Sequence, residues 1–249
     1  MLRLFVLISL IILSLSAEKI KLALSSNVAY AFEDLKKAFN KKHPDIKITS
    51  SLASSGKLTS LILHGAPYDI FISADMSYPQ YLYEKKLSVS KPIVYARGSL
   101  VLFSQKQRDF SQGLALISHS SIKKIALANT LTAPYGKASL HALKKLNLFT
   151  KNKHKFIYAS NISQSITYAL SASELAFIAK ASLYSKTLKR YKKNIHWIEV
   201  DSSLYPALNQ GIILLKRARK NKAAKKFYDF MLNKEAQEIL KKYGYNIND

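Results

Sequence analysis

The chain has 249 residues and contains no cysteine. This absence excludes disulfides, thiol catalysis, iron–sulfur clusters and zinc sites built from thiolates. Acidic residues are also scarce, because 15 Asp and Glu stand against 39 Lys and Arg, and the formal net charge is +24. So large a positive charge favours an anionic partner, which could be a nucleic acid, a membrane surface or a small anionic ligand. The 48% of apolar residues indicates a globular chain and excludes a disordered one.

Sequence motifs of the common enzyme classes are missing as well. Neither the Gly-x-Ser-x-Gly elbow nor the Gly-x-x-x-x-Gly-Lys-Ser/Thr loop occurs. Ser54 and Lys57 have the spacing of a serine acyl-enzyme with a lysine base, but the companion Ser-Asp-Asn and Lys-Thr-Gly segments are absent. The six histidines are scattered and form no His-x-x-x-His pair. We therefore predict no catalytic residues, no cofactor and no metal coordinated by side chains.

Long apolar runs are absent beyond the N-terminus. Arg3 precedes an apolar run of about 12 residues, which ends in the small residues 14–17. This order is typical of a secretory signal, whereas a membrane span needs roughly 20 apolar residues. We predict that residues 1–17 are a signal peptide and that the mature protein is periplasmic. The alternative is an uncleaved anchor. Export also argues against a nucleic-acid partner, despite the charge.

Short apolar runs and stretches of helical spacing alternate along the rest of the chain. The predicted strands are 20–24, 46–52, 68–74, 99–104, 124–128, 156–159, 175–179, 195–200 and 211–215. The predicted helices are 27–40, 57–64, 79–85, 134–146, 163–171, 222–232 and 235–242. Alternation of this kind predicts an α/β fold with parallel strands.

Four of the loops that join a strand to a helix have the same chemistry. They comprise residues 25–27, 54–56, 133–136 and 160–164, and three of the four add hydroxyl or amide donors to the backbone N–H groups of a helix start. The first turn of a helix has unpaired backbone N–H groups and about half a positive charge, and it therefore binds anions. In an open α/β sheet such loops lie together at the carboxyl ends of the strands. Each loop alone could be an ordinary helix cap. Four of them in one exported chain predict a shared anion site.

Five segments of the chain carry a recognisable pattern: 25–31 (SSNVAYA), 52–58 (LASSGKL), 65–75 (GAPYDIFISAD), 161–164 (NISQ) and 242–245 (KYGY). Together they resemble the molybdate-binding periplasmic proteins of ABC importers. The run 65–75, about ten residues after Ala-Ser-Ser, is the most specific of them. The resemblance covers nearly the whole mature chain.

The resemblance implies a two-lobed periplasmic binding protein fold of type II, in which each lobe is a mixed sheet flanked by helices. Lobe 1 would comprise residues 18–97 and 208–249, and lobe 2 residues 98–207. The family's ligand positions fall on Ser26, Asn27, Ser55, Tyr135 and Ile162. Ser55 would donate its hydroxyl and its N–H, and Asn27, Tyr135 and Ile162 mainly their backbone N–H. A monomer that passes its ligand to a membrane permease is expected.

Two departures from the family concern side-chain donors. Some members have Ser at the position of Asn27 and Ala at that of Tyr135. Others use a tyrosine hydroxyl where this chain has Ala179, and Tyr135 is then a candidate to compensate.

The alternatives that remain are other solutes and other partners. None of the four loops contains an acidic residue, which favours an anion without a proton, such as molybdate, tungstate or sulfate. Phosphate and ferric iron are further solutes to consider. A cationic exported protein that binds polyanions, either nucleic acid or anionic lipid, would show salt-sensitive binding and no tight site for a small anion.

Overall fold

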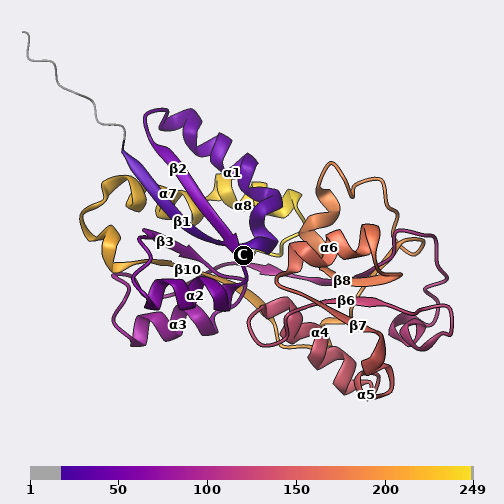
Figure 1. Cartoon of the computed structure of the whole chain (residues 1–249). Coiled ribbons are helices and arrows are strands. Elements are labelled where there is room, and N and C mark those ends of the chain that lie inside the picture. The colour runs from indigo at the N-terminus through magenta and orange to yellow at the C-terminus, as the bar shows by residue number, and fades with distance from the viewer. Residues whose placement is uncertain (1–17, 248–249) are drawn as a thin grey trace, which may run out of the picture.

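The computed structural model describes residues 18–247, and the predicted signal peptide at residues 1–17 lies outside this range. The described chain forms two five-stranded sheets, each with its own helices, which lie side by side (Figure 1). We call the half built on the first sheet lobe 1 and the half built on the second lobe 2. No described helix combines the length and the apolar character that crossing a membrane requires.

The sheet of lobe 1 has the strand order β2-β1-β3-β10-β4. These strands are β1 (Lys19–Ser25), β2 (Lys47–Ala53), β3 (Ile70–Ile72), β4 (Ile93–Gly98) and β10 (Leu208–Leu214). β1 pairs in parallel with β2 and β3, whereas β10 runs antiparallel to β3 and β4. The sheet is therefore mixed, as the family resemblance implies, and not wholly parallel.

The sheet of lobe 2 repeats this plan with the order β7-β6-β8-β5-β9. Its strands are β5 (Leu100–Phe103), β6 (Ile125–Ala128), β7 (Phe156–Ala159), β8 (Leu175–Ala179) and β9 (Trp197–Glu199). β6 is parallel to β7 and β8, and β5 is antiparallel to β8 and β9. The chain passes from lobe 1 to lobe 2 between β4 and β5 and returns between β9 and β10. The residue at which each lobe begins and ends stays a prediction.

The helices follow the predicted positions closely, except that the short helix Phe149–Asn152 was not predicted. Lobe 1 carries α1 (Ala29–Lys42), α2 (Ser55–Leu63), α3 (Ser77–Glu84), α7 (Lys222–Met231) and α8 (Lys234–Lys242). Lobe 2 carries α4 (Pro134–Lys145), α5 (Phe149–Asn152) and α6 (Ile162–Ser171). The 3-10 turns are η1 (Ser26–Val28), η2 (Gly113–Ser118), η3 (Lys153–Lys155), η4 (Lys180–Tyr184), η5 (Ser202–Leu204) and η6 (Lys216–Lys220).

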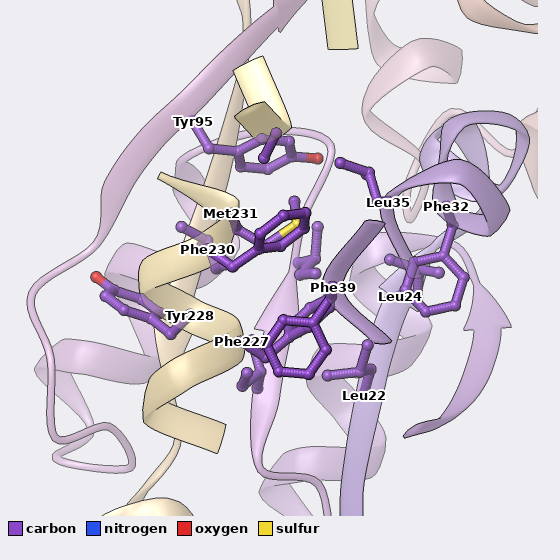
Figure 2. Close-up of a cluster of buried hydrophobic side chains, with 14 of the residues drawn as sticks. Leu22, Leu24, Phe32, Leu35, Phe39, Tyr95, Phe227, Tyr228, Phe230 and Met231 are labelled. Atoms are coloured by element: carbon purple, nitrogen blue, oxygen red, sulfur yellow. The ribbon is translucent and has the colours of Figure 1, made fainter. Parts of the chain in front are cut away.

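The core of lobe 1 joins the two ends of the described chain. The apolar face of α1 buries Phe32, Leu35 and Phe39, which are spaced as one side of a helix. Aromatic residues of α7 pack against this face (Figure 2). The ring of Phe39 lies 5.0 Å from that of Phe227 and 5.5 Å from that of Phe230, both edge to face. The C-terminal helices are thus an integral part of the first lobe.

We expect Phe39→Ala to destabilise the protein by about 3–5 kcal/mol, because it removes a fully buried ring and leaves a cavity. Leu61→Ala is the matched control, since Leu61 is 38% exposed and its loss should cost within about 0.5 kcal/mol. Denaturant unfolding of both variants checks this. Equal unfolding midpoints would contradict the assignment of Phe39 to the core.

Candidate functional site

The four loops of the predicted anion site lie at the carboxyl ends of their strands. In lobe 1 the register pairs Ser25 at the end of β1 with Ala53 at the end of β2. In lobe 2 it pairs Ala128 at the end of β6 with Ala159 at the end of β7. The turns that follow each pair are consequently neighbours, as expected for a parallel arrangement.

Within lobe 1, the serines of the first and second turns are joined directly. The hydroxyl of Ser55, at the start of α2, lies 3.2 Å from the hydroxyl of Ser25. The backbone N–H of Ala74, which follows β3, donates to the Ser55 hydroxyl oxygen at 3.0 Å. Ser55 is fully buried. Three strand ends of lobe 1 therefore meet at one serine side chain.

The second turn also contacts the third, which belongs to lobe 2. The backbone N–H of Gly56 donates to the carbonyl of Thr132 at 2.9 Å. The hydroxyl of Ser54 lies 3.2 Å from that of Thr132. Thr132 immediately precedes the loop 133–136 that opens α4. The two lobes are thus in contact where the predicted site lies.

A further contact joins the first turn to the fourth. The hydroxyl of Ser163, in the first turn of α6, donates to the carbonyl of Ser26 at 3.0 Å. Together these hydrogen bonds connect the four loops in the spatial order 133–136, 54–56, 25–27 and 160–164. The structure therefore brings together the loops that carry all five predicted site residues, and it buries each of these residues: Ser26, Asn27, Ser55, Tyr135 and Ile162.

Backbone N–H groups at three of these positions remain available. Ser55 and Ile162 are the first residues of α2 and α6, and Tyr135 is the second residue of α4. No residue earlier in the helix accepts from such N–H groups. Among the hydrogen bonds of residues 18–247, none uses the backbone N–H of Ser55, Tyr135 or Ile162. The helix starts therefore offer uncharged donors in a buried place.

The side-chain amide nitrogen of Asn27 is used within the protein, whereas its Oδ1 is buried and has no hydrogen-bond partner among the described residues. Its amide nitrogen donates to Gln210 Oε1 at 2.7 Å and to the Tyr245 hydroxyl at 3.0 Å. The same hydroxyl donates to the Asn27 carbonyl at 3.1 Å. Both amide hydrogens of Asn27 are thereby used, so only its backbone N–H is left for a ligand.

Sequence reasoning missed Gln210 altogether, and it placed Tyr245 in the similar segment 242–245 without predicting its contact with Asn27. Gln210 is fully buried in β10, and its amide nitrogen donates to the carbonyls of Ala74 and Leu208 at 3.1 and 2.7 Å. A glutamine next to the apolar run 211–215 is the signal that could have found it, because a buried amide needs partners for all its polar atoms.

The Tyr135 side chain reaches Gly98, the last residue of β4, where the chain passes from lobe 1 to lobe 2. Its hydroxyl lies against Gly98, where any side chain would overlap it. Within the described residues this hydroxyl has no hydrogen-bond partner. Burial raises the pKa of Tyr135 well above its usual range, and the neighbouring Tyr245 and Tyr95 add to the effect. The phenol therefore stays neutral near the site.

Asp75 directly follows Ala74, whose N–H contacts Ser55, and the Asp75 carboxylate accepts hydrogen bonds from residues of lobe 1. It accepts from the Ser77 hydroxyl at 2.9 Å and from the backbone N–H of Tyr78 at 3.4 Å. Burial raises the pKa of Asp75, which its hydrogen bonds and Lys137 partly offset. These contacts brace the loop after β3. The described residues hold no group of three or more His, Asp or Glu that could bind a metal.

The arrangement defines a solute-binding class of protein, in which two α/β lobes meet over buried backbone donors. Comparison with known families supports this, because the sequence model of the bacterial extracellular solute-binding proteins matches residues 20–246. The chain belongs to this family.

Two curated relatives are similar over most of their length. The chain is 29% identical to the molybdate-binding protein ModA of Azotobacter vinelandii, over 93% of this chain and 91% of the relative. It is 30% identical to the ModA of Rhodobacter capsulatus, over 80% of this chain and 77% of that protein. The solved periplasmic molybdate-binding protein of Azotobacter vinelandii superimposes with a TM-score of 0.85 at 27% identity, covering 92% of this chain and all of that one. The predicted resemblance and the two-lobed mixed-sheet fold are thus confirmed.

We expect Gln210→Leu to destabilise the protein by about 1–3 kcal/mol, because it leaves an Asn27 amide hydrogen and the carbonyls of Ala74 and Leu208 without partners. Gln80→Leu is the control, since Gln80 is exposed on α3 and its loss should change stability by no more than about 0.5 kcal/mol. Thermal and denaturant unfolding measure both. A Gln210 variant as stable as the Gln80 variant would show that the buried network contributes nothing.

Proposed function

We propose that this protein captures molybdate, or the similar tungstate, between its two lobes and delivers it to the membrane permease of an ABC importer in the periplasm. The observation that carries the proposal is the meeting of four helix or 3-10 turns, two from each lobe, joined by hydrogen bonds through Ser25, Ser55, Thr132 and Ser163. The relatives named as molybdate-binding proteins add independent support.

The chemistry of the site suits a dianion that carries no proton. Molybdate is a tetrahedral oxyanion, and each hydrogen bond to its charged oxygens contributes roughly 1.5–3 kcal/mol. Backbone N–H groups of Ser55, Tyr135 and Ile162, at the starts of three helices, would supply such bonds without a cationic side chain. Ser26 and Asn27 would add donors from the first turn. Several bonds together support tight binding after the cost of closing the lobes.

Phosphate is a poorer fit because at neutral pH it carries a hydrogen that needs an acceptor. The four turns contain no carboxylate to accept it. Sulfate carries no proton but is smaller, so a rigid set of donors separates it from molybdate by size. Tungstate and molybdate are nearly the same size, and we expect the site to bind both.

The Ser55 hydroxyl is the side-chain donor on which we expect binding to depend most. The N–H of Ala74 occupies one lone pair of its oxygen and thereby holds the side chain in place. The hydroxyl hydrogen, directed at Ser25 in this structure, can rotate toward a ligand while Ser25 donates in return.

Binding of this kind needs no catalytic residue and no cofactor, and the partners are the anion and the permease. Ligand capture would involve a hinge motion about the two segments that join the lobes. The mature chain would lose Arg3 with the signal peptide and so carry one positive charge fewer than the +24 of the full sequence; this charge would raise the rate of encounter with anions, and the effect should weaken as salt increases. We expect a monomer with no nucleic-acid partner.

Calorimetric titration with molybdate, tungstate, sulfate and phosphate tests the proposal. We expect tight binding of the first two, a strong rise in melting temperature with molybdate, and hardly any with sulfate. Tight binding of sulfate or phosphate in place of molybdate would identify the protein as a binder of that anion. Salt-sensitive binding of nucleic acid or anionic vesicles, with no small-anion site, would favour the polyanion alternative.

Substitution of Ser55 locates the site. Ser55→Ala should weaken molybdate binding by about 10- to 100-fold through the loss of one charge-assisted hydrogen bond, and Ser55→Asp should weaken it more, because it places a negative charge against the anion. Ser60→Asp is the matched control, since Ser60 is exposed on the same helix. If Ser55→Asp binds molybdate as well as the parent, the site assignment is wrong.

A further inference from the structure

The loop between β6 and α4 contacts lobe 1 through residues that are not among the predicted ligand positions. The side-chain oxygen of Asn129 accepts from the backbone N–H groups of Leu131 and Thr132, at 2.9 and 3.0 Å. The backbone N–H groups of Leu131 and Thr132 are thus bonded within the loop, and the carbonyls of the same two residues are left for other partners. Both of these carbonyls accept hydrogen bonds from lobe 1.

Gly56 receives the Thr132 carbonyl at the start of α2. Its N–H donates at 2.9 Å, so lobe 2 takes one of the free N–H groups of this helix. A Cβ at position 56 would lie 2.7 Å from the Tyr78 hydroxyl and 2.9 Å from the Thr132 carbonyl oxygen. Gly56 lies within a helix and has no positive φ, so its own backbone does not require glycine. The Tyr78 hydroxyl of lobe 1 is the end of a side chain that can move aside, whereas the Thr132 backbone of lobe 2 is fixed in its own loop, so the close approach of lobe 2 is the main reason for a glycine here.

Tyr78, on α3 of lobe 1, makes the neighbouring contact. Its hydroxyl donates to the Leu131 carbonyl at 3.2 Å and accepts from Lys137 Nζ at 3.2 Å. The same ammonium group lies 4.7 Å from the centre of the Tyr78 ring, within the range of a cation–π interaction. Lys137 belongs to α4 of lobe 2, so one tyrosine holds two separate groups of the opposite lobe.

We propose that these contacts form a latch that sets the balance between open and closed lobes, and thereby the affinity for the oxyanion. The latch consists of Gly56 and Tyr78 on lobe 1 and of Asn129, Leu131, Thr132 and Lys137 on lobe 2. The latch rests on the proposed function, because its effect on affinity presupposes a ligand between the lobes. Its residues act by positioning the lobes and not by touching the ligand. The apparent dissociation constant then rises as the closed fraction falls, and the change appears chiefly in the rate of ligand release.

Gly56→Ala separates this role from a purely structural one. Alanine is the better helix former, so the variant should be at least as stable as the parent without ligand. The new methyl group nevertheless obstructs the Thr132 carbonyl, and molybdate binding should weaken by about 10-fold or more. A variant that is stable, binds weakly and releases molybdate faster is the expected signature.

Tyr78→Phe is a second variant with no steric effect. It removes the hydroxyl contacts to Leu131 and Lys137 and should weaken molybdate binding by about 2- to 10-fold. Tyr81→Phe is its matched control, because Tyr81 lies on the same helix, is 42% exposed, and makes no hydrogen bond to lobe 2 within the described residues. Calorimetry and stopped-flow release of molybdate measure both. Affinities of Gly56→Ala and Tyr78→Phe within twofold of the parent would overturn the latch.

A distance measurement keeps the test independent of the ligand. The chain has no cysteine, so Ser60→Cys and Lys144→Cys on the exposed faces of α2 and α4 provide the only two thiols for spin labels. We expect Gly56→Ala to move the distance distribution of the unliganded protein toward longer values. If the parent binds none of the four anions, the proposed function fails. The distance distribution then tests by itself whether these contacts hold the lobes closed. An unchanged distribution then overturns the latch.

Discussion

The hydrogen bonds of the Asn27 side chain are the constraint on which the rest of the arrangement depends. One buried amide joins the turn after the first strand to Gln210 on the strand that returns from lobe 2 and to Tyr245 near the C-terminus. Gln210 continues the network to the carbonyls of Ala74 and Leu208. Three distant parts of the chain are thereby fixed at the point where the lobes join. Because an unpaired buried amide is costly, the network allows few other arrangements.

This constraint places uncharged donors where an anion can use them. The first turn is held by Asn27, the second by the contacts of Ser55 to Ser25 and Ala74, and both are then met by turns of lobe 2. The protein carries a charge of +24, yet the five predicted ligand residues include no cation. In the proposed function, the charge would serve the approach of an anion, whereas the geometry of the helix starts would serve its selection.

The sequence predicted most of the elements, and the misses have physical causes. β4 was overlooked because its apolar run, residues 93–96, is only four residues long and lies between Pro92 and Arg97. The sheets were expected to be parallel from the alternation of strands and helices, but β10 returns from the other lobe and pairs antiparallel. Its direction follows from the route of the chain between lobes, which local periodicity does not encode. The contacts of Gln210 and Tyr245 with Asn27 were missed for the same reason, since the two residues lie 183 and 218 positions away from it along the chain.

The sequence by itself determined the class of protein and the chemistry of the predicted site. Small polar residues directly after apolar runs specify helix starts with free N–H groups, and this is a local property of the chain. Only the tertiary structure decided which of those groups face one another, that both amide hydrogens of Asn27 are used internally, and that Gly56 meets the Thr132 carbonyl of the other lobe. These outcomes depend on how two separately folded sheets are set against each other. That placement results from many buried contacts between distant residues, which no short stretch of sequence contains.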